Sequence, residues 1–311
     1  MMQKKVDGKT ASEWAKLGMD KFDANKFKEA IDCFEKSVKI YPQNPVIWNN
    51  MGVAYENLGD FEKEIECCKK ALEIDPKDNS SWYNMGVGYG KLEKNKEAIG
   101  AYKEAIKLDP KDKSSWFNLG HSYRKLEDFQ NAIESFEKAI KLDNKYITAW
   151  RNLGLLYTFV RNHKKAIDAY NEVIKIEPDD SDIWFNLGLE YLNLGNDRKA
   201  IECYDKAVFI NPNNTIAWNN MGFSYSNLGK HKKAVECYEK AIKSNPNHSS
   251  SWFNLGISNA HLENDEKAIE CFEKVLKIDP KNKGSKTYLV KLRKKLKREA
   301  EKKINQSKSF I

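Results

Sequence analysis

Apolar side chains recur along this chain at the spacing of an α-helix, in pairs of short stretches separated by polar residues. In residues 45–78 the two apolar stripes are Trp48, Met51 and Tyr55, then Ile65, Cys68 and Leu72. Apolar residues three, four and seven positions apart share one face of a helix. Asp60 lies between the stripes, where its side chain suits the N-cap of the second helix. The pattern predicts two helices joined by a turn.

This helical pair returns with a fixed period of 34 residues. Every Trp of the chain follows the period: Trp14, Trp48, Trp82, Trp116, Trp150, Trp184, Trp218 and Trp252. Gly stands four residues after each Trp. A bulky residue at this constant period is typical of stacked helix–turn–helix repeats. We predict eight repeats, at residues 11–44, 45–78, 79–112, 113–146, 147–180, 181–214, 215–248 and 249–282.

The ends of the repeats and of the chain show different signals. Pro ends seven of the repeats because it cannot continue a helix, and Asn144 takes its place in the fourth. Residues 1–10 are polar and are expected to be disordered. Residues 283–304 continue a weak apolar stripe through Leu289, Leu292 and Leu296 on an otherwise basic helix. We predict a capping helix there, followed by a frayed tail at 305–311.

The residues that recur resemble the tetratricopeptide repeat (TPR) family. The fourth repeat carries the family's pattern as Trp116, Leu119, Gly120, Tyr123, Ala132, Phe136 and Ala139. The resemblance implies an all-α fold, a right-handed superhelix whose Trp, Gly and Ala residues are scaffold. It also implies a protein–protein interaction scaffold or adaptor. Departures are few: Glu64 and Cys68 replace a small residue and an aromatic, and Lys21 and Asn259 replace Tyr in the end repeats.

Charge and cysteine content add information about the environment of the protein. The net charge of +8 belongs to the end of the chain, where eleven Lys or Arg against two Glu follow residue 282. Cys residues at equivalent places in stacked repeats are expected to lie too far apart for disulfides. The two adjacent Cys do not have the spacing of a metal site. We therefore expect the six Cys to be buried, reduced thiols. We found no apolar run that could span a membrane and no secretory leader. These features predict a cytoplasmic protein.

Motifs for catalysis are not found in the sequence. It has no glycine-rich phosphate loop, no Gly-x-Ser-x-Gly elbow and no His-Glu-x-x-His. The five His are scattered, and His163 and His231 share a corner position that we interpret as a solvated turn. Acidic residues are spread along helix surfaces, where solvation is the default. We therefore expect no enzyme activity, no cofactor and no metal.

A ladder of Asn residues gives the better functional signal. Asn stands two residues after Trp in seven repeats: Asn50, Asn84, Asn118, Asn152, Asn186, Asn220 and Asn254. In the family this position lines the concave surface, where an Asn ladder resembles one that grips an extended peptide. A side-chain amide both donates and accepts, so it matches any peptide unit. The alternative is that Asn solvates the groove or bonds a neighbouring helix.

Residues around the ladder would give specificity. Candidate peptide-binding side chains are Tyr83, Phe117, Arg124, Arg151 and Phe185, together with Lys91, His121, Lys125, Phe159 and Asn193 at other inner positions. Aromatics beside Lys and Arg suit an acidic partner segment with apolar anchors. The residue pairs of the family's carboxylate clamp are not found, which argues against a clamp-type chaperone cofactor.

The basic end of the chain supports a rival interpretation. Its Lys and Arg side chains could meet the phosphates of nucleic acid or an anionic membrane surface. Aromatic residues for base stacking are missing from Arg293 to Ser309, and leucines used for capping cannot also enter lipid. Nothing in the pattern identifies the partner or the oligomeric state.

Overall fold

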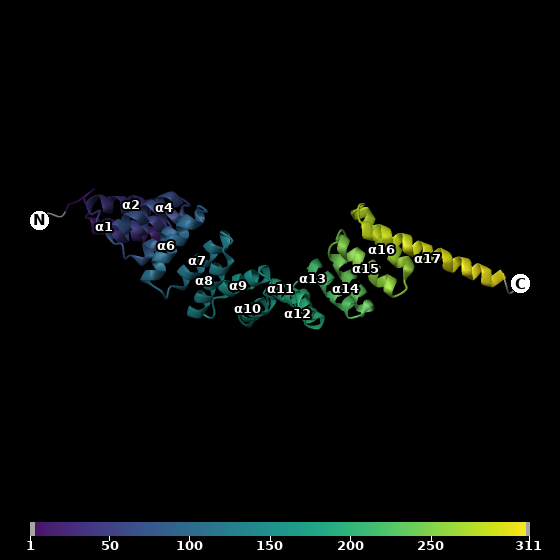
Figure 1. Ribbon diagram of the computed structural model, residues 1–311. Coiled ribbons are helices and arrows are strands. Elements are labelled where there is room, and N and C mark those ends of the chain that lie inside the picture. The colour runs from purple at the N-terminus through teal and green to yellow at the C-terminus, as the bar shows by residue number, and fades with distance from the viewer. Residues whose placement is uncertain (1–3, 309–311) are drawn as a thin grey trace. The chain divides into compact units, whose positions relative to one another are not determined.

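The computed structural model describes residues 4–308, and the side chains of residues 4–302. Within this range the chain folds into helices joined by short turns (Figure 1). In chain order they are α1 (Ala11–Asp23), α2 (Phe27–Ile40), α3 (Pro45–Asn57), α4 (Phe61–Ile74), α5 (Asn79–Lys91), α6 (Asn95–Leu108), α7 (Lys113–Lys125), α8 (Phe129–Leu142), α9 (Ile147–Phe159), α10 (His163–Ile176), α11 (Ser181–Asn193), α12 (Asp197–Ile210), α13 (Thr215–Asn227), α14 (His231–Ser244), α15 (Ser249–His261), α16 (Asp265–Ile278) and α17 (Lys283–Lys308). The all-α class is confirmed.

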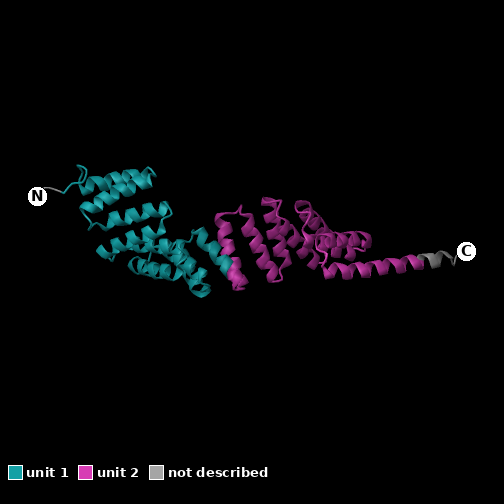
Figure 2. Cartoon of the chain, turned by 90° about the horizontal axis from the view of Figure 1, so that it is seen from above, with its two compact units in different colours: residues 1–156 teal, residues 157–311 magenta. Residues whose placement is uncertain are grey.

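The chain divides into two compact units, residues 1–156 and residues 157–311, which Figure 2 colours separately. In each unit the helices pack as consecutive antiparallel pairs, and each pair contacts its neighbours in sequence. The boundary between the units falls within α9.

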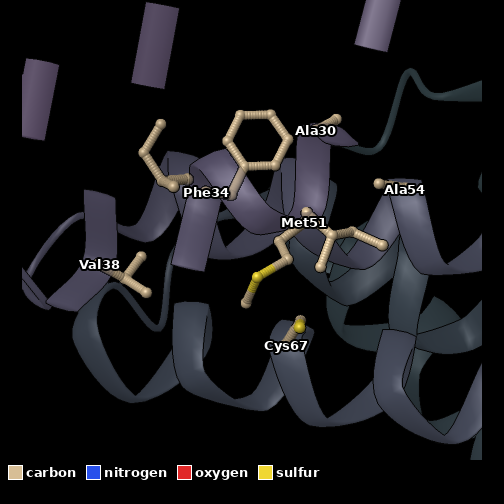
Figure 3. Close-up of a cluster of buried hydrophobic side chains, with 8 residues drawn as sticks. Ala30, Phe34, Val38, Met51, Ala54 and Cys67 are labelled. Atoms are coloured by element: carbon tan, nitrogen blue, oxygen red, sulfur yellow. The ribbon is translucent and has the colours of Figure 1, made fainter. Parts of the chain in front are cut away.

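A glycine and a facing aromatic ring bring the two helices of a repeat together. In the third repeat a Cβ atom added to Gly86 would lie 2.6 Å from Tyr102 Cε1, closer than any side chain permits. Ala98, on the same helix as Tyr102, is fully buried. Phe34 packs in the same way in the first repeat, among Ala30, Met51 and Cys67 (Figure 3). The consensus residues thus form the core, as predicted.

The tryptophans fasten each repeat to the turn that precedes it. The Trp48 indole N–H donates to the Pro42 carbonyl oxygen at 2.8 Å, six residues upstream. The same bond recurs from Trp82, Trp116, Trp150, Trp184, Trp218 and Trp252. Asn144 replaces Pro as the acceptor for Trp150, so this corner keeps the bond without the proline. These indoles are half-buried, at the edge of the core.

The turn inside each repeat needs one residue with a left-handed backbone. Residues 25, 59, 93, 127, 161, 195, 229 and 263 all have φ between 58° and 78°. Gly occupies three of these places, and Asn, Glu or Arg the others. Left-handed backbone costs a non-glycine residue free energy.

The second repeat departs from the common core. Cys68 provides no aromatic ring over Gly52, and the Glu64 side chain lies buried where Ala is usual. Among the described residues neither carboxyl oxygen of Glu64 has a hydrogen-bond partner. The expectation that acidic residues lie on solvated surfaces is wrong for Glu64.

Both ends of the chain carry more structure than expected. Residues 4–10, expected to be disordered, include an isolated bridge between Val6 and Lys9, and the Val6 carbonyl accepts from Trp14 Nε1 at 2.8 Å. Helix α17 continues beyond the expected end at 304 to Lys308, into the segment expected to fray. Residues 1–3 and 309–311 lie outside the described range. Leu289 and Leu292 of α17 pack on Phe272, so the helix covers the last repeat.

Candidate functional site

Two hollows lie on the first-helix side of the repeats in the unit formed by residues 1–156. The first, here named the α5–α7 pocket, has a volume of about 420 Å³. Its lining includes Val87, Gly90, Lys91, Glu93, Asn95, Tyr102, Phe117, Asn118, His121, Ser122 and Lys125. Five of the inner residues singled out in the sequence therefore meet in one pocket: Lys91, Phe117, Asn118, His121 and Lys125.

The α5–α7 pocket is deeper because Gly90, in its lining, has no side chain. Gly90 lines it, and a Cβ atom added there would meet only the Tyr102 hydroxyl oxygen, at 3.9 Å. Tyr102 is 3% exposed, and burial raises its pKa, so the hydroxyl keeps its proton. Within the described residues this hydroxyl has no hydrogen-bond partner. The sequence analysis overlooked both residues, although three glycines in α5 were a signal.

Cationic side chains surround the pocket. Lys91 and Lys125 are exposed, and within the described residues neither ammonium group forms an ion pair. Arg124 Nη2 lies 3.1 Å from His121 Nε2. A guanidinium group can only donate, so Nε2 accepts and Nδ1 carries the imidazole hydrogen. Burial, then the charges of Arg124 and Lys125, lower the pKa of His121, which favours this neutral form.

Aromatic packing holds one wall of the pocket in place. The Phe117 ring lies 5.4 Å from the Phe136 ring and 5.1 Å from the Tyr146 ring, measured between centroids. Tyr83 packs against Tyr102 at 6.0 Å. Rings fixed in this way lose little conformational entropy when a ligand binds.

The second hollow, here named the α3–α7 hollow, lies toward the other end of the same first helices. Its volume is about 700 Å³ and it is open to solvent. Its lining includes Asn49, Tyr83 and Asn84, and the charged residues Asp109, Lys111, Asp112 and Lys113. The α5–α7 pocket and the α3–α7 hollow together contain four of the proposed peptide-binding residues, Tyr83, Asn84, Phe117 and Asn118.

The Asn ladder is partly engaged within the protein. Asn84 Nδ2 donates to Asn49 Oδ1 at 2.9 Å, and Asn118 Nδ2 donates to the Tyr83 hydroxyl at 3.1 Å. Asn254 Nδ2 repeats this contact with Asn219 Oδ1 at 3.2 Å. Each bond joins a ladder residue to the preceding repeat, as the structural alternative expected.

The remaining ladder residues differ from this arrangement. Asn50 Nδ2 lies 3.2 Å from Met19 Sδ, and Asn152 Nδ2 donates to the Thr148 carbonyl at 2.8 Å. Asn220 Oδ1 accepts from its neighbour Asn219. All seven, including Asn186, are half-buried. The hydrogen-bond partners of the ladder residues therefore differ from repeat to repeat, and the seven Asn do not form one uniform row.

The corresponding face in residues 157–311 is more apolar. Phe185 packs against Tyr204 at 6.0 Å between ring centroids. Leu189 and Ile257 occupy the position held by His121 in the fourth repeat, and Phe223, also at that position, is 43% exposed. Arg151, of residues 1–156, is half-buried on α9 outside both hollows.

A buried polar network in residues 157–311 was missed by the sequence analysis. The Glu190 carboxylate, whose side chain is 1% exposed, accepts from Thr158 Oγ1 at 2.8 Å and lies 2.7 Å from His163 Nδ1. His163 thus does not sit in a solvated turn, and the His231 ring likewise stacks on His261 at 4.4 Å. A Glu where all other repeats but the first have small or apolar residues was the available signal. Among the described residues no His, Cys, Asp or Glu cluster suits a metal ion.

Comparison with protein families agrees with this geometry. The profile of the tetratricopeptide repeat matches residues 45–78, 80–112, 114–146, 147–180, 181–214, 215–248 and 249–282, and a TPR repeat profile matches residues 18–59. The chain belongs to the tetratricopeptide repeat family, whose members serve generally as non-catalytic scaffolds for protein–protein interaction. No curated protein sequence matches the chain.

Solved structures of TPR proteins have the same fold. YrrB, described as a TPR protein with an unusual peptide-binding site, has a TM-score of 0.54 and 24% identity, over 60% of this chain and 96% of its own. MamA has a TM-score of 0.51 and 29% identity, over 53% of this chain and 91% of its own. The Naa15/Naa10 complex bound to HypK-THB has a TM-score of 0.60 and 17% identity, over 80% of this chain and 39% of its own.

The structure also bears on the membrane question. None of the helices described has both the length and the apolar character required to cross a lipid bilayer.

Proposed function

We propose that this protein is an interaction scaffold that holds a segment of a partner protein, extended or helical, against the first helices of residues 1–156. The observation that carries the proposal is the pair of hollows along the same first helices, both lined by first-helix residues. Two hollows with polar and aromatic walls, placed along the same helices, suit a chain segment better than a compact small molecule.

The Asn residues would contribute backbone recognition. A primary amide has two N–H donors and an acceptor oxygen. The bonds from Asn84 and Asn118 to the preceding repeat each use one donor, which leaves an N–H and the oxygen of each side chain for a peptide. The same bonds orient the amides in advance and lower the entropy cost of binding. Asn50, Asn152, Asn186, Asn220 and Asn254 remain candidates on the same reasoning.

The neighbouring side chains favour an acidic segment with apolar anchors. Lys91 and Lys125 of the α5–α7 pocket, with Arg124 beside His121, provide positive charge, and Tyr83 and Phe117 provide aromatic surface. Arg151 and Phe185 are included in the proposal because they occupy, in their own repeats, the position that Phe117 holds in the fourth repeat.

An array of random twelve-residue peptides would test the scaffold function. The wild-type protein is expected to bind a subset of peptides, and the double substitution Asn84→Ala, Asn118→Ala to weaken that binding about tenfold, since each lost bond is worth about 0.5–1.5 kcal/mol. Asn131→Ala, on the second helix α8, is the matched control and should bind as wild type. If the double variant keeps its fold and binds every peptide like wild type, the groove proposal is wrong.

The basic face of α17 is the rival binding surface. Lys291, Lys294 and Lys297 are exposed, whereas Leu289 and Leu292 are buried in the cap and cannot enter lipid. Substituting the three lysines by Gln should leave peptide binding unchanged. Loss of binding in this variant alone would favour the tail, through phosphates or other anions.

A further inference from the structure

We propose that the α5–α7 pocket binds the carboxylate side chain of an acidic residue in the partner segment, and that Gly90 makes this possible. The inference rests on the proposed scaffold function and specifies what one part of that surface recognises. Its three supports are an excess of hydrogen-bond donors, a tyrosine hydroxyl that bonds to no described residue, and the space that Gly90 leaves open.

The pocket offers donors and positive charge well beyond its acceptors. Lys91 and Lys125 bring two ammonium groups without ion pairs among the described residues. His121 presents Nδ1–H, because Arg124 occupies its Nε2. Glu93 is the one acidic side chain in the lining. Such a set of donors matches an anionic oxygen group, and charge-assisted bonds of this kind are about twice as strong as neutral ones.

The Tyr102 hydroxyl adds a donor at the bottom. The residue is 3% exposed, yet its hydroxyl bonds to nothing within the described part of the chain. A hydroxyl that lines a pocket can donate to a ligand there. Among the equivalent tyrosines, Tyr170 has a partner, because its hydroxyl lies 3.1 Å from Thr158 Oγ1, whereas the Tyr204 hydroxyl is buried with no partner among the described residues. An acceptor from a ligand would satisfy the Tyr102 hydroxyl.

Gly90 leaves the way to that hydroxyl open. The equivalent residues of the other repeats all have a side chain: Phe22, Glu56, Arg124, Thr158, Leu192, Ser226 and Ala260. Glycine in a helix is destabilising by about 0.8–1.0 kcal/mol relative to alanine. Nothing else in the surroundings of Gly90 requires glycine, since an added Cβ would make no contact closer than 3.9 Å. The absent side chain is therefore explained by the space it leaves.

The surrounding apolar surface argues for a peptide residue over a free anion. Val87 and Phe117 line the pocket beside the donors, so the carboxylate would arrive on a chain with apolar contacts of its own. A phosphorylated residue shares the anionic chemistry, and the experiment separates it from Asp and Glu.

Gly90→Leu provides a test in which folding is not at risk. Leucine would fill the pocket while improving the helix, so the melting temperature should stay equal or rise. Gly100→Leu is the matched control: Gly100 is exposed on α6, with no atom within 4 Å of an added Cβ. The random twelve-residue peptide array would be probed with four proteins: wild type, the two glycine variants, and the double variant Lys91→Gln, Lys125→Gln. Selected peptides would then be resynthesised with Gln or phosphoserine in place of the acidic residue.

The expected result is enrichment of Asp and Glu among peptides bound by wild type and by Gly100→Leu. Glu→Gln should weaken binding about tenfold for these two proteins, and should have no effect on Gly90→Leu or the lysine variant. Tighter binding of phosphoserine than of Glu would overturn the carboxylate assignment. Peptide binding without acid preference, or acid preference retained by Gly90→Leu, would overturn the pocket inference alone. If wild type binds no peptide, the scaffold proposal itself fails.

Discussion

Single residues adjust a common repeat to local needs, and Glu64 is the strongest case. Its carboxyl group occupies space that Ala and an aromatic ring share in other repeats, and a Cβ atom added to Gly88 would lie only 3.0 Å from Glu64 Oε2. Burial, reinforced by the charge of Glu56 and opposed by that of Lys91, raises the pKa of Glu64 from 4.5 to about 8. Glu190, equally buried, has hydrogen-bond partners that Glu64 lacks.

The raised pKa of Glu64 predicts that stability falls as pH rises. The neutral acid is favoured in the folded state, so its contribution is complete below pH 4.5 and is lost as pH rises through about 8. Glu64→Gln should remove this dependence, which amounts to about 5 kcal/mol at most. Urea denaturation at pH 5 and pH 8.5 would measure it. A Gln variant that loses as much stability as wild type between these two values would contradict the assignment.

The helices of the eight repeats begin and end close to where the sequence predicts, whereas α17 runs past its expected end and the turns contain a feature that was not predicted. Pro, Asp60 and the recurring Gly mark the helix pairs, and these signals are local, so sequence reasoning found them. The left-handed turn residue was not found, because only Gly59, Gly195 and Gly229 announce it while Glu and Arg occupy equivalent places. Partner choice is also beyond local reasoning: Glu190 pairs with His163, 27 residues away, and the bond depends on how two repeats face each other.

The turns should respond to substitution in opposite directions. Glu127 has φ of 60°, so Glu127→Gly should stabilise the protein by about 1 kcal/mol through relief of backbone strain. Gly195→Glu should lower stability by a similar amount. Glu127→Ala controls for loss of the charge and should bring no gain. Equal unfolding free energies for Glu127→Gly and Glu127→Ala would show that the turn is not strained.

At the scale of the whole molecule, the contacts are between helices that are close neighbours in sequence. Within each unit helices contact those next to them or next but one in sequence. Stability in such proteins is approximately a sum of repeat and neighbour terms. The sequence period predicted this organisation well. It also singled out five residues of the α5–α7 pocket, whereas the roles of Gly90 and Tyr102 depend on how two helices pack and were not predicted.

A weakened cap should therefore have a local effect. Leu289 is buried against the last repeat, so Leu289→Ala should cost about 2–4 kcal/mol there. Amide hydrogen exchange should accelerate in α15, α16 and α17 and stay unchanged in α1 to α4. Val290→Ala, at a neighbouring side chain that is 69% exposed, is the control. Faster exchange throughout the chain would indicate cooperative unfolding of all repeats.

The indole-to-carbonyl bond that recurs from repeat to repeat has a practical consequence. Because Trp occupies the same place in every repeat, the intrinsic fluorescence of the protein samples each repeat once and averages over them. Replacing seven of the eight by Phe would leave a single emitter whose spectrum shifts when its own turn opens. A panel of such variants would give the order in which the repeats melt, with no added dye.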